Sequence, residues 1–166
     1  MKIHPIGIIH SHYKQMTGTP IQTAFSDDCE GTVEIFPNYQ KGLKDLDGFS
    51  HIILIYYFHK STGYSLLCRP FLDDVERGLF ATRAPRRPNP IGLSVVRLKE
   101  INDNILRVSS LDILDETPLL DIKPYIPRFD SPKAQNVGWF KKAFEKKKNG
   151  MLADDRFTNE ELHNKK

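Results

Sequence analysis

The chain has 166 residues, of which 39% are hydrophobic and 27% charged, and a formal net charge of +3. It is most simply one domain with its own core, and this charge is too small to indicate nucleic-acid binding by itself. The longest apolar run, 52–58, is far too short to span a membrane, and the first residues lack the pattern of a signal peptide. Cys29 and Cys68 match neither a disulfide framework nor a zinc site, so we expect reduced thiols in a cytoplasmic protein without a bound metal.

The first part of the chain is predicted to form three strands. Residues 3–10 are apolar with interleaved polar positions, and a loop follows over 11–20. Residues 31–36 alternate between polar and apolar side chains, as a strand with one buried face does. A turn or short helix over 37–48 then leads to residues 51–59. These are β-branched and aromatic without alternation, which predicts a strand buried on both faces.

The most informative stretch of the sequence lies between residues 78 and 94. Three prolines and three arginines fall within 83–90, which excludes a helix and a central strand. Because apolar segments flank it at 79–81 and 93–96, we interpret it as a rigid loop between two strands. Six basic residues and no acidic one occur from Arg77 to Lys99, which indicates an anionic ligand. A solvated connector is the alternative interpretation.

The following residues predict more antiparallel strands. Segments 93–99 and 105–111 have strand character, and 102–104 joins them as a hairpin turn, since Asn and Asp tolerate positive φ. Residues 112–125 continue with alternating acidic and apolar positions. Short strands punctuated by turns favour a mainly β fold, a small antiparallel-rich β-barrel with short helices.

The last part of the chain changes character. Residues 136–148 predict a C-terminal helix with Val137, Phe140 and Phe144 on one face. Residues 151–166 are polar with little to bury and are expected to form a loose tail or a small appendage. We therefore expect a barrel domain over residues 1–132, and a helix with a polar tail over 133–166.

Three separated motifs resemble those of the TrmO family, also called YaeB-like or TsaA-like proteins. They are Thr82-Arg83 followed by Arg87-Pro88-Asn89-Pro90-Ile91-Gly92-Leu93-Ser94, then Leu111-Asp112 with Asp115 and Thr117-Pro118, and finally Asp121-Ile122-Lys123-Pro124-Tyr125. Members of this family are S-adenosylmethionine-dependent enzymes that methylate threonylcarbamoyladenosine next to the tRNA anticodon. The resemblance covers most of residues 3–130 and implies a small β-barrel that forms a homodimer, uses S-adenosylmethionine and acts on tRNA.

The resemblance also implies which residues contact the cofactor. An arginine can bind the carboxylate of S-adenosylmethionine through two parallel hydrogen bonds, and Arg83 is the candidate. Leu93 would form an apolar wall against the adenine, and Asp112 would accept hydrogen bonds from the ribose hydroxyls or the ammonium group. The implied cofactor-binding residues are Met16, Thr17, Gly18, His59, Lys60, Arg83, Leu93, Ser109, Ser110, Leu111 and Asp112.

Methyl transfer requires mainly the alignment of the nucleophile, the methyl carbon and the sulfur. The carbamoyl-substituted adenine nitrogen is a poor nucleophile until its proton leaves, so a general base is expected. The candidate bases are His59, Asp121 and Tyr125. The candidates for contacts with tRNA phosphates are Arg86, Arg87, Lys123 and Arg128.

Two other functions remain open at this point. The chain would also suit a non-catalytic protein that senses S-adenosylmethionine or a related nucleotide. A cofactor-free RNA-binding barrel, whose arginine loop grips phosphate, is the second alternative.

Overall fold

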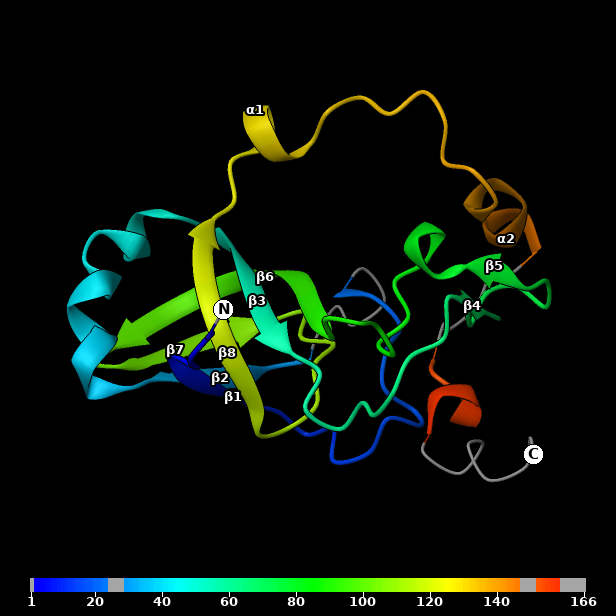
Figure 1. Ribbon diagram of the computed structural model, residues 1–166. Helices are drawn as coiled ribbons and strands as arrows, with labels where there is room; N and C mark the ends of the chain where they lie inside the picture. The colour runs from blue at the N-terminus through cyan, green and yellow to red at the C-terminus, as the bar shows by residue number, and fades with distance from the viewer. Residues whose placement is uncertain (1, 24–28, 147–151, 159–166) are drawn as a thin grey trace.

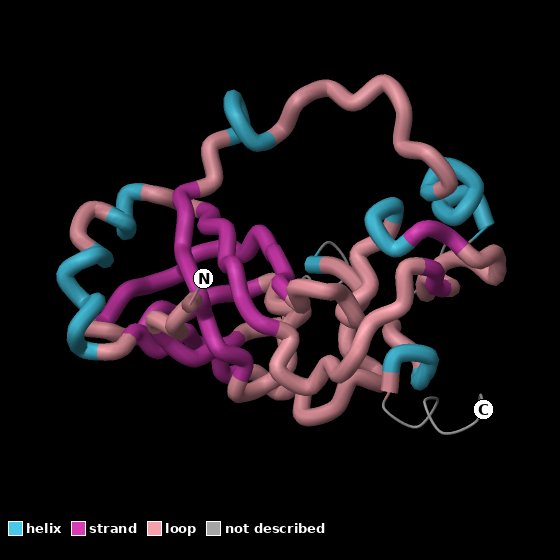
Figure 2. Tube along the Cα trace, in the orientation of Figure 1, coloured by secondary structure: helices cyan, strands magenta, loops and turns pink. Residues whose placement is uncertain are grey.

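Six antiparallel strands close into a barrel in this computed structural model, which describes residues 2–23, 29–146 and 152–158 (Figures 1 and 2). Around the barrel the order of the strands is β1-β2-β7-β6-β3-β8. Their bounds are β1 Gly7–His10, β2 Gly31–Ile35, β3 His51–Tyr57, β6 Ile91–Asn102, β7 Ile105–Ser109 and β8 Thr117–Pro124. The mainly β, antiparallel barrel that the sequence predicts is confirmed.

The hydrophobic core fills the interior of this barrel. Its fully buried side chains include Ile9, Val33, Ile52, Leu54, Val96, Leu106, Val108 and Leu119. Along β3, burial alternates, so Ile53 and Ile55 lie on the outer face and are only partly buried. The expectation that this strand is buried on both faces is therefore wrong. A closed barrel has a single packed interior, and alternate residues of each strand must face outward.

The strand pairings bring the segments that follow β1 and β3, and the segments that precede β6 and β8, to one end of the barrel. β8 pairs antiparallel with both β1 and β3 and so completes the closure. Because neighbouring strands are antiparallel, the loop that follows one strand lies beside the segment that precedes the next. The register shifts at Ile55 and Tyr56, where β3 meets β8, which marks a bulge at this end. Bulges are common at barrel rims and beside functional sites.

Two of the segments between barrel strands have the structure predicted from the sequence, and a third does not. Asp103 has a φ of 53° in the β6–β7 turn, as predicted for 102–104, and the segment after β2 forms the short 3₁₀ helices η2 (Pro37–Leu43) and η3 (Leu46–Gly48). Residues 79–81, expected as a strand, instead form a 3₁₀ turn, η4 (Leu79–Ala81).

The turn at η4 has a clear physical cause. Both the backbone amide and the hydroxyl of Thr82 donate to the carbonyl oxygen of Leu79, at 3.0 and 2.8 Å. Leu79 is thereby folded into a small second hydrophobic cluster, where it is 1% exposed. A separate two-stranded sheet, β4 (Leu67–Cys68) with β5 (Arg77–Gly78), precedes it.

The chain beyond β8 leaves the barrel. After the short helix α1 (Pro127–Asp130), residues 131–138 are exposed and arch across to α2 (Phe140–Lys146), which lies near β4 and β5 (Figure 1). The predicted helix thus begins only at Phe140. Val137 precedes it and is 53% exposed, so the expected apolar face with Val137 is wrong. The side chain of Phe144 and residues 147–151 lie outside the described residues.

Of the two alternatives for the end of the chain, residues 152–158 form an attached appendage and not a loose tail. The amide of Gly18 donates to the carbonyl of Ala153, and the amide of Ala153 donates to that of Thr19, each at 2.8 Å. Phe157, in the 3₁₀ turn η5 (Asp155–Phe157), is 7% exposed. Its ring packs edge to face against that of Phe71, with ring centroids 4.9 Å apart. One apolar side chain therefore ties this polar segment to the second hydrophobic cluster. Residues 151 and 159–166 lie outside the described residues.

Replacing Phe157 with alanine should release the C-terminal segment. We expect Phe157→Ala to lower the free energy of unfolding by up to about 3 kcal/mol, because a buried phenyl ring is lost. The amide of Ala153 should also exchange faster with solvent. Urea unfolding and hydrogen exchange measure the two effects. The control is Leu152→Ala, since Leu152 is 57% exposed; equal losses in both variants would contradict the anchoring role of Phe157.

Candidate functional site

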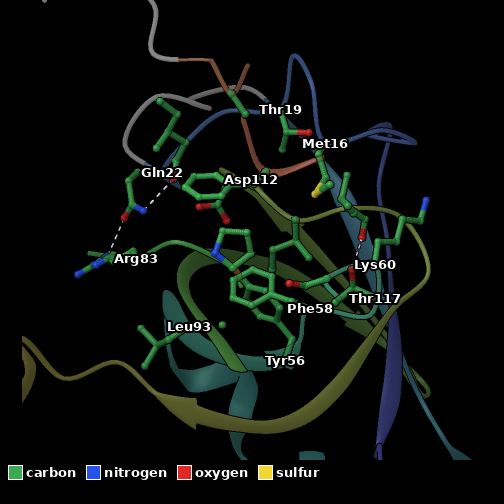
Figure 3. Close-up of a pocket in the computed structure, with 18 of the residues that line it drawn as sticks. Met16, Thr19, Gln22, Tyr56, Phe58, Lys60, Arg83, Leu93, Asp112 and Thr117 are labelled. Atoms are coloured by element: carbon green, nitrogen blue, oxygen red, sulfur yellow. Dashed lines mark hydrogen bonds between the residues drawn. The ribbon is translucent and has the colours of Figure 1, made fainter. Parts of the chain in front are cut away.

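A cavity of about 390 Å³ opens at the end of the barrel where the segments after β1 and β3 meet those before β6 and β8 (Figure 3). Its volume lies within the range of about 300–1,000 Å³ typical of small-molecule sites. The walls come from parts of the chain that are far apart in sequence. They are the loop 16–22, the end of β3 with 58–61, the loop 82–93, the segment 112–117, and Ala153 with Phe157. We call this hollow the first cavity.

The loop 82–93, which contains the proline–arginine stretch and which we call the signature loop, presents the guanidinium of Arg83 at the rim and uses those of Arg86 and Arg87 for contacts within the protein. Arg83 donates to Oε1 of Gln22 at 2.6 Å, and both side chains lie at one side of the cavity in Figure 3. Arg87 donates to the carbonyl oxygens of Thr82 and Ala84, at 3.1 and 3.4 Å, within its own loop. Arg86 donates to the carbonyl oxygen of Thr158 and so holds the C-terminal segment. Arg83 is therefore the arginine of this loop best placed to meet a ligand in the first cavity.

Aromatic side chains form the floor of the first cavity. Tyr56 and Phe58 meet edge to face, with ring centroids 5.4 Å apart, and both contact Gly92. A Cβ atom at position 92 would lie 2.3 Å from Cε2 of Tyr56 and 2.9 Å from Cζ of Phe58. The glycine in this motif is required because the two rings occupy the space of any larger side chain.

A buried hydrogen-bond relay leads from this floor to a carboxylate. Oγ of Ser94 donates to Oδ1 of Asp112 at 2.7 Å. Since the hydroxyl proton of Ser94 is used there, Tyr56 must donate its own hydroxyl to Oγ of Ser94, at 3.1 Å. Asp112 remains partly exposed to the cavity, but the protein around it removes much of its hydration. This desolvation raises the pKa of Asp112 to about 6, against the opposing effect of its hydrogen-bond donors.

His59 presents a buried lone pair on the opposite side of the site. Oγ1 of Thr117 donates to the carbonyl oxygen of Leu114 at 2.7 Å and lies 3.3 Å from Nδ1 of His59. The only donor left for this contact is Nδ1–H, so the neutral ring carries its proton there. Nε2 is then an acceptor, and it is buried without a partner among the described residues. Burial and the neighbouring Lys60 hold the pKa of His59 below its ordinary value.

Six of the residues that the sequence suggested for cofactor binding line the first cavity: Met16, His59, Lys60, Arg83, Leu93 and Asp112. The other five do not: Thr17, Gly18, Ser109, Ser110 and Leu111. Leu111 is fully buried in the barrel core, and Ser110 has a φ of 62°. These two residues turn the chain at the end of β7, so they determine where Asp112 emerges.

The remaining candidates are spread over the surface. Asp121 pairs with Lys123 at 2.8 Å on β8 and does not line the first cavity. Tyr125 lines a second cavity, and Arg128 is exposed on α1. The described residues contain no group of three histidine, cysteine or acidic side chains placed to hold a metal ion. Among the described helices, none has the length and apolar character needed to cross a membrane.

Sequence reasoning missed several lining residues. The sequence places Tyr56 and Phe58 only in a strand, although their spacing of two residues puts both side chains on the same face of it. Thr117 was noted as part of a motif without a role. Phe157 carried no signal, because a single aromatic residue in a polar segment does not reveal what it packs against.

The fold and this site define a small antiparallel β-barrel with a cofactor-sized cavity at one end. Residues 8–131 match the family model described as the tRNA-methyltransferase O N-terminal domain. The chain belongs to this TrmO family, as its three motifs predicted.

Similar proteins fall into two named groups. A probable S-adenosyl-L-methionine-binding protein of Pyrococcus abyssi is 56% identical over 142 residues, which is 86% of this chain and 77% of that protein. The tRNA (adenine(37)-N6)-methyltransferase of Escherichia coli strain K12 is 37% identical over 136 residues, or 76% of this chain and 58% of the enzyme. A crystal structure of TrmO from Pseudomonas aeruginosa superimposes with a TM-score of 0.71 at 35% identity, covering 84% of this chain and 62% of that chain. The present chain thus spans about six tenths of the latter two proteins.

Adding one methyl group at position 92 should disturb the aromatic floor. We expect Gly92→Ala to destabilise the protein by about 1–3 kcal/mol, because rigid rings of Tyr56 and Phe58 must shift. Gly48→Ala is the matched control, since nothing lies within 4 Å of a Cβ atom there. Urea unfolding compares the two variants. If Gly92→Ala left the free energy of unfolding unchanged, the rings would not be tightly packed against this glycine.

The buried carboxylate should cost the protein stability. The folded-state pKa of Asp112, about 6, exceeds its ordinary value of 3.8, so the folded protein binds this proton more tightly than the unfolded chain. Asp112→Asn should therefore be more stable than wild type at pH 7, by up to about 3 kcal/mol. The difference should shrink as the pH falls through about 6 toward 4, where the wild-type carboxyl becomes protonated in the folded state. Urea unfolding across this pH range measures it, and a less stable variant at pH 7 would contradict the assignment.

Proposed function

We propose that the first cavity binds S-adenosylmethionine, and that the protein methylates N6 of threonylcarbamoyladenosine next to the tRNA anticodon. The observation that carries this proposal is the placement of the Arg83 guanidinium at the rim of an aromatic and apolar cavity. S-adenosylmethionine combines a carboxylate, an ammonium group, a sulfonium ion and a flat adenosine. The cavity provides groups complementary to the carboxylate, the ammonium group and the adenosine.

The residues present fit the cofactor on three counts. Gln22, which Arg83 now contacts, is a neutral partner that a carboxylate would replace with a stronger, charge-assisted bond. Tyr56, Phe58 and Leu93 provide apolar surface for the adenine. Nε2 of His59 is an acceptor without a partner among the described residues, and the ammonium group of the cofactor would donate to it once the atoms that cover Nε2 move aside. Lys60 already donates to the carbonyl oxygen of Lys14, so it closes the other side of the site.

When bound, the cofactor supplies a methyl carbon that is activated by a positively charged sulfur. The protein has to hold the two reactants in line and exclude water, which accounts for most of the rate of such a transfer. Arg83 orients one end of the cofactor, and the aromatic floor excludes solvent from the reacting atoms. The segment 152–158 contributes Ala153 and Phe157 to the same wall.

The name of the Pyrococcus abyssi protein, a probable S-adenosyl-L-methionine-binding protein, states cofactor binding and no reaction, so a non-catalytic S-adenosylmethionine-binding protein is the second candidate. The names of the more distant relatives, including the Escherichia coli enzyme, support tRNA as the partner. On the RNA side, Lys123 and Arg128 are exposed and best placed to meet phosphates, since Arg86 and Arg87 already bind carbonyl groups of the protein. A homodimer and a cytoplasmic location stay predictions of the family resemblance.

Calorimetric titration tests the cofactor site. Wild-type protein is expected to bind S-adenosylmethionine with a dissociation constant of roughly micromolar order, and ATP serves as the control ligand. Arg83→Ala should weaken binding about 10- to 150-fold, because a charged hydrogen bond contributes about 1.5–3 kcal/mol. Arg86 is an unsuitable control because it holds Thr158.

Arg97→Ala is the matched control, since Arg97 is exposed, does not line the first cavity and lies four residues along β6 from Leu93, the nearest residue of that strand that does. Equal losses in the two variants would make Arg83 part of a general basic surface. If wild-type protein showed no heat with S-adenosylmethionine but bound tRNA, the chain would be the cofactor-free RNA-binding barrel. Cofactor binding without any methylated tRNA would favour the binding protein.

A further inference from the structure

A second cavity of about 290 Å³ adjoins the first. Ile53 and Val95, on the outer face of β3 and β6, form its floor, and Tyr125 and Asp130 come from the chain that leaves β8. The hollow therefore lies outside the barrel, between its wall and the segment that contains α1.

The two cavities share a wall. Gln22, Arg83, Leu93 and Asp112 line both. In Figure 3, Gln22, Arg83 and Leu93 lie on the side of the first cavity away from Met16 and Lys60, and Asp112 lies between the two sides. Ligands bound in the two cavities would thus lie side by side, each in contact with these four residues.

This arrangement suits a reaction between two bound molecules. Reacting atoms must approach to about 3–3.5 Å, so a methyl donor and its acceptor require adjoining sites with a common boundary. The second cavity has apolar floor residues and the ring of Tyr125, which are surfaces that stack on or pack against a nucleobase. Lys123 pairs directly with Ile53, so its side chain emerges beside the floor of this cavity, and Arg128 lies two residues before Asp130. Both cations are placed to meet phosphates of an RNA that inserts a base here.

We propose that the second cavity binds the acceptor adenine of the RNA, and that Asp112 removes the proton from its carbamoylated N6 nitrogen. This inference rests on the proposed function. It differs from the role that the sequence suggested for Asp112, which was to bind the ribose or the ammonium group of the cofactor.

The proton and electron balance is complete with the two substrates. The N6–H bond breaks, and its proton passes to a carboxylate oxygen of Asp112. The electron pair left on nitrogen forms the new bond to the methyl carbon, while the carbon–sulfur pair returns to sulfur and neutralises the sulfonium charge. The protonated Asp112 then releases its proton to solvent.

Position distinguishes Asp112 from the bases that the sequence suggested. His59 lines only the first cavity, and Tyr125 only the second. Asp121 lines neither cavity and is paired with Lys123. Of these four residues, only Asp112 lines both cavities.

The surroundings of Asp112 also suit a proton acceptor. Ser94 orients one oxygen, and the backbone amides of Thr23 and of Asp112 itself add two further donors. A carboxylate accepts about four hydrogen bonds, one more than these. The charged and titratable groups that face it are Arg83 from the signature loop, Tyr56 from β3, Tyr13 from the loop after β1, and Tyr125 and Asp130 from the chain after β8. A carboxyl group whose pKa has been raised toward neutrality is a stronger base than an exposed one.

The first test separates proton transfer from cofactor binding. Each variant is titrated with S-adenosylmethionine by calorimetry, and methylation is then measured in a single turnover. The substrate is an anticodon stem-loop RNA that carries N6-threonylcarbamoyladenosine. Asp112→Asn should bind the cofactor within about threefold of wild type, yet lose about 100-fold or more in rate. Asp47→Asn, an exposed carboxylate on η3, is the matched control and should keep both values.

The pH profile provides a signature that a structural role would not produce. The single-turnover rate of wild type should rise with pH and level off above about 6, where Asp112 becomes ionised. The residual rate of Asp112→Asn should lack this step. Asp47→Asn should retain the wild-type profile.

The second test addresses the base-binding cavity. RNA affinity is measured with the demethylated cofactor, S-adenosylhomocysteine, so that no reaction occurs. Tyr125→Ala should weaken RNA binding about tenfold, because the stacking surface is lost, and should leave S-adenosylmethionine binding unchanged. The control is Tyr39→Ala, since Tyr39 is a tyrosine on η2 that is 45% exposed.

Four results would overturn the proposal. If Asp112→Asn lost cofactor binding, Asp112 would be a cofactor ligand, and the proposed function would stand without this role. An unchanged rate in Asp112→Asn, or an unchanged RNA affinity in Tyr125→Ala, would refute the base or its site in the same way. A wild-type protein that binds S-adenosylmethionine but methylates no RNA would refute both the transfer reaction and the role of Asp112.

Discussion

Closure of the barrel is the constraint on which the rest of the structure depends. β8 pairs with β1 on one side and with β3 on the other, so no strand of the barrel is left with an unpaired edge. The same pairing brings the loop after β1, the end of β3, the signature loop and the segment before β8 to one rim. The side chains that line the first cavity are held by loops and strand ends at that rim, whereas Tyr125 and Asp130 reach the second cavity from the chain after β8. The core inside the barrel provides the rigidity that these loops lack by themselves.

The functional groups at the rim lower the stability of the folded protein. Asp112 is an acidic group in a place that disfavours its charge, and Nε2 of His59 is buried without a hydrogen-bond partner among the described residues. Neither arrangement helps the chain to fold, and each leaves a group ready to interact with a ligand. The signature loop shows the complementary strategy. Arg87 and Arg86 donate to backbone carbonyl groups of the loop and of the C-terminal segment, whereas Arg83 stays at the rim.

The sequence predicted more of the fold than of the site. Alternation and turn residues located the strands, and the three motifs identified the family, because both are local patterns. The two-sided burial expected for β3 was wrong, because β-branched residues are favoured on both faces of a strand whether or not one is fully covered. Within 78–94, the motif indicated an anion site but did not distinguish between its three arginines. That distinction depends on carbonyl groups that are near in space, such as that of Thr158, which lies 72 residues from Arg86.

The sequence by itself determined the class of fold, the family, and the short list of polar residues from which a site would be built. Only the tertiary structure decided that Asp112 lies between two cavities, that Tyr56 and Phe58 form a floor against Gly92, and that Phe157 returns to the barrel as part of the same wall. The reason is physical: strand and turn preferences act between residues close in the chain. Cavities form where segments distant in the chain meet, and their shape follows from strand register and barrel closure, which no local pattern encodes.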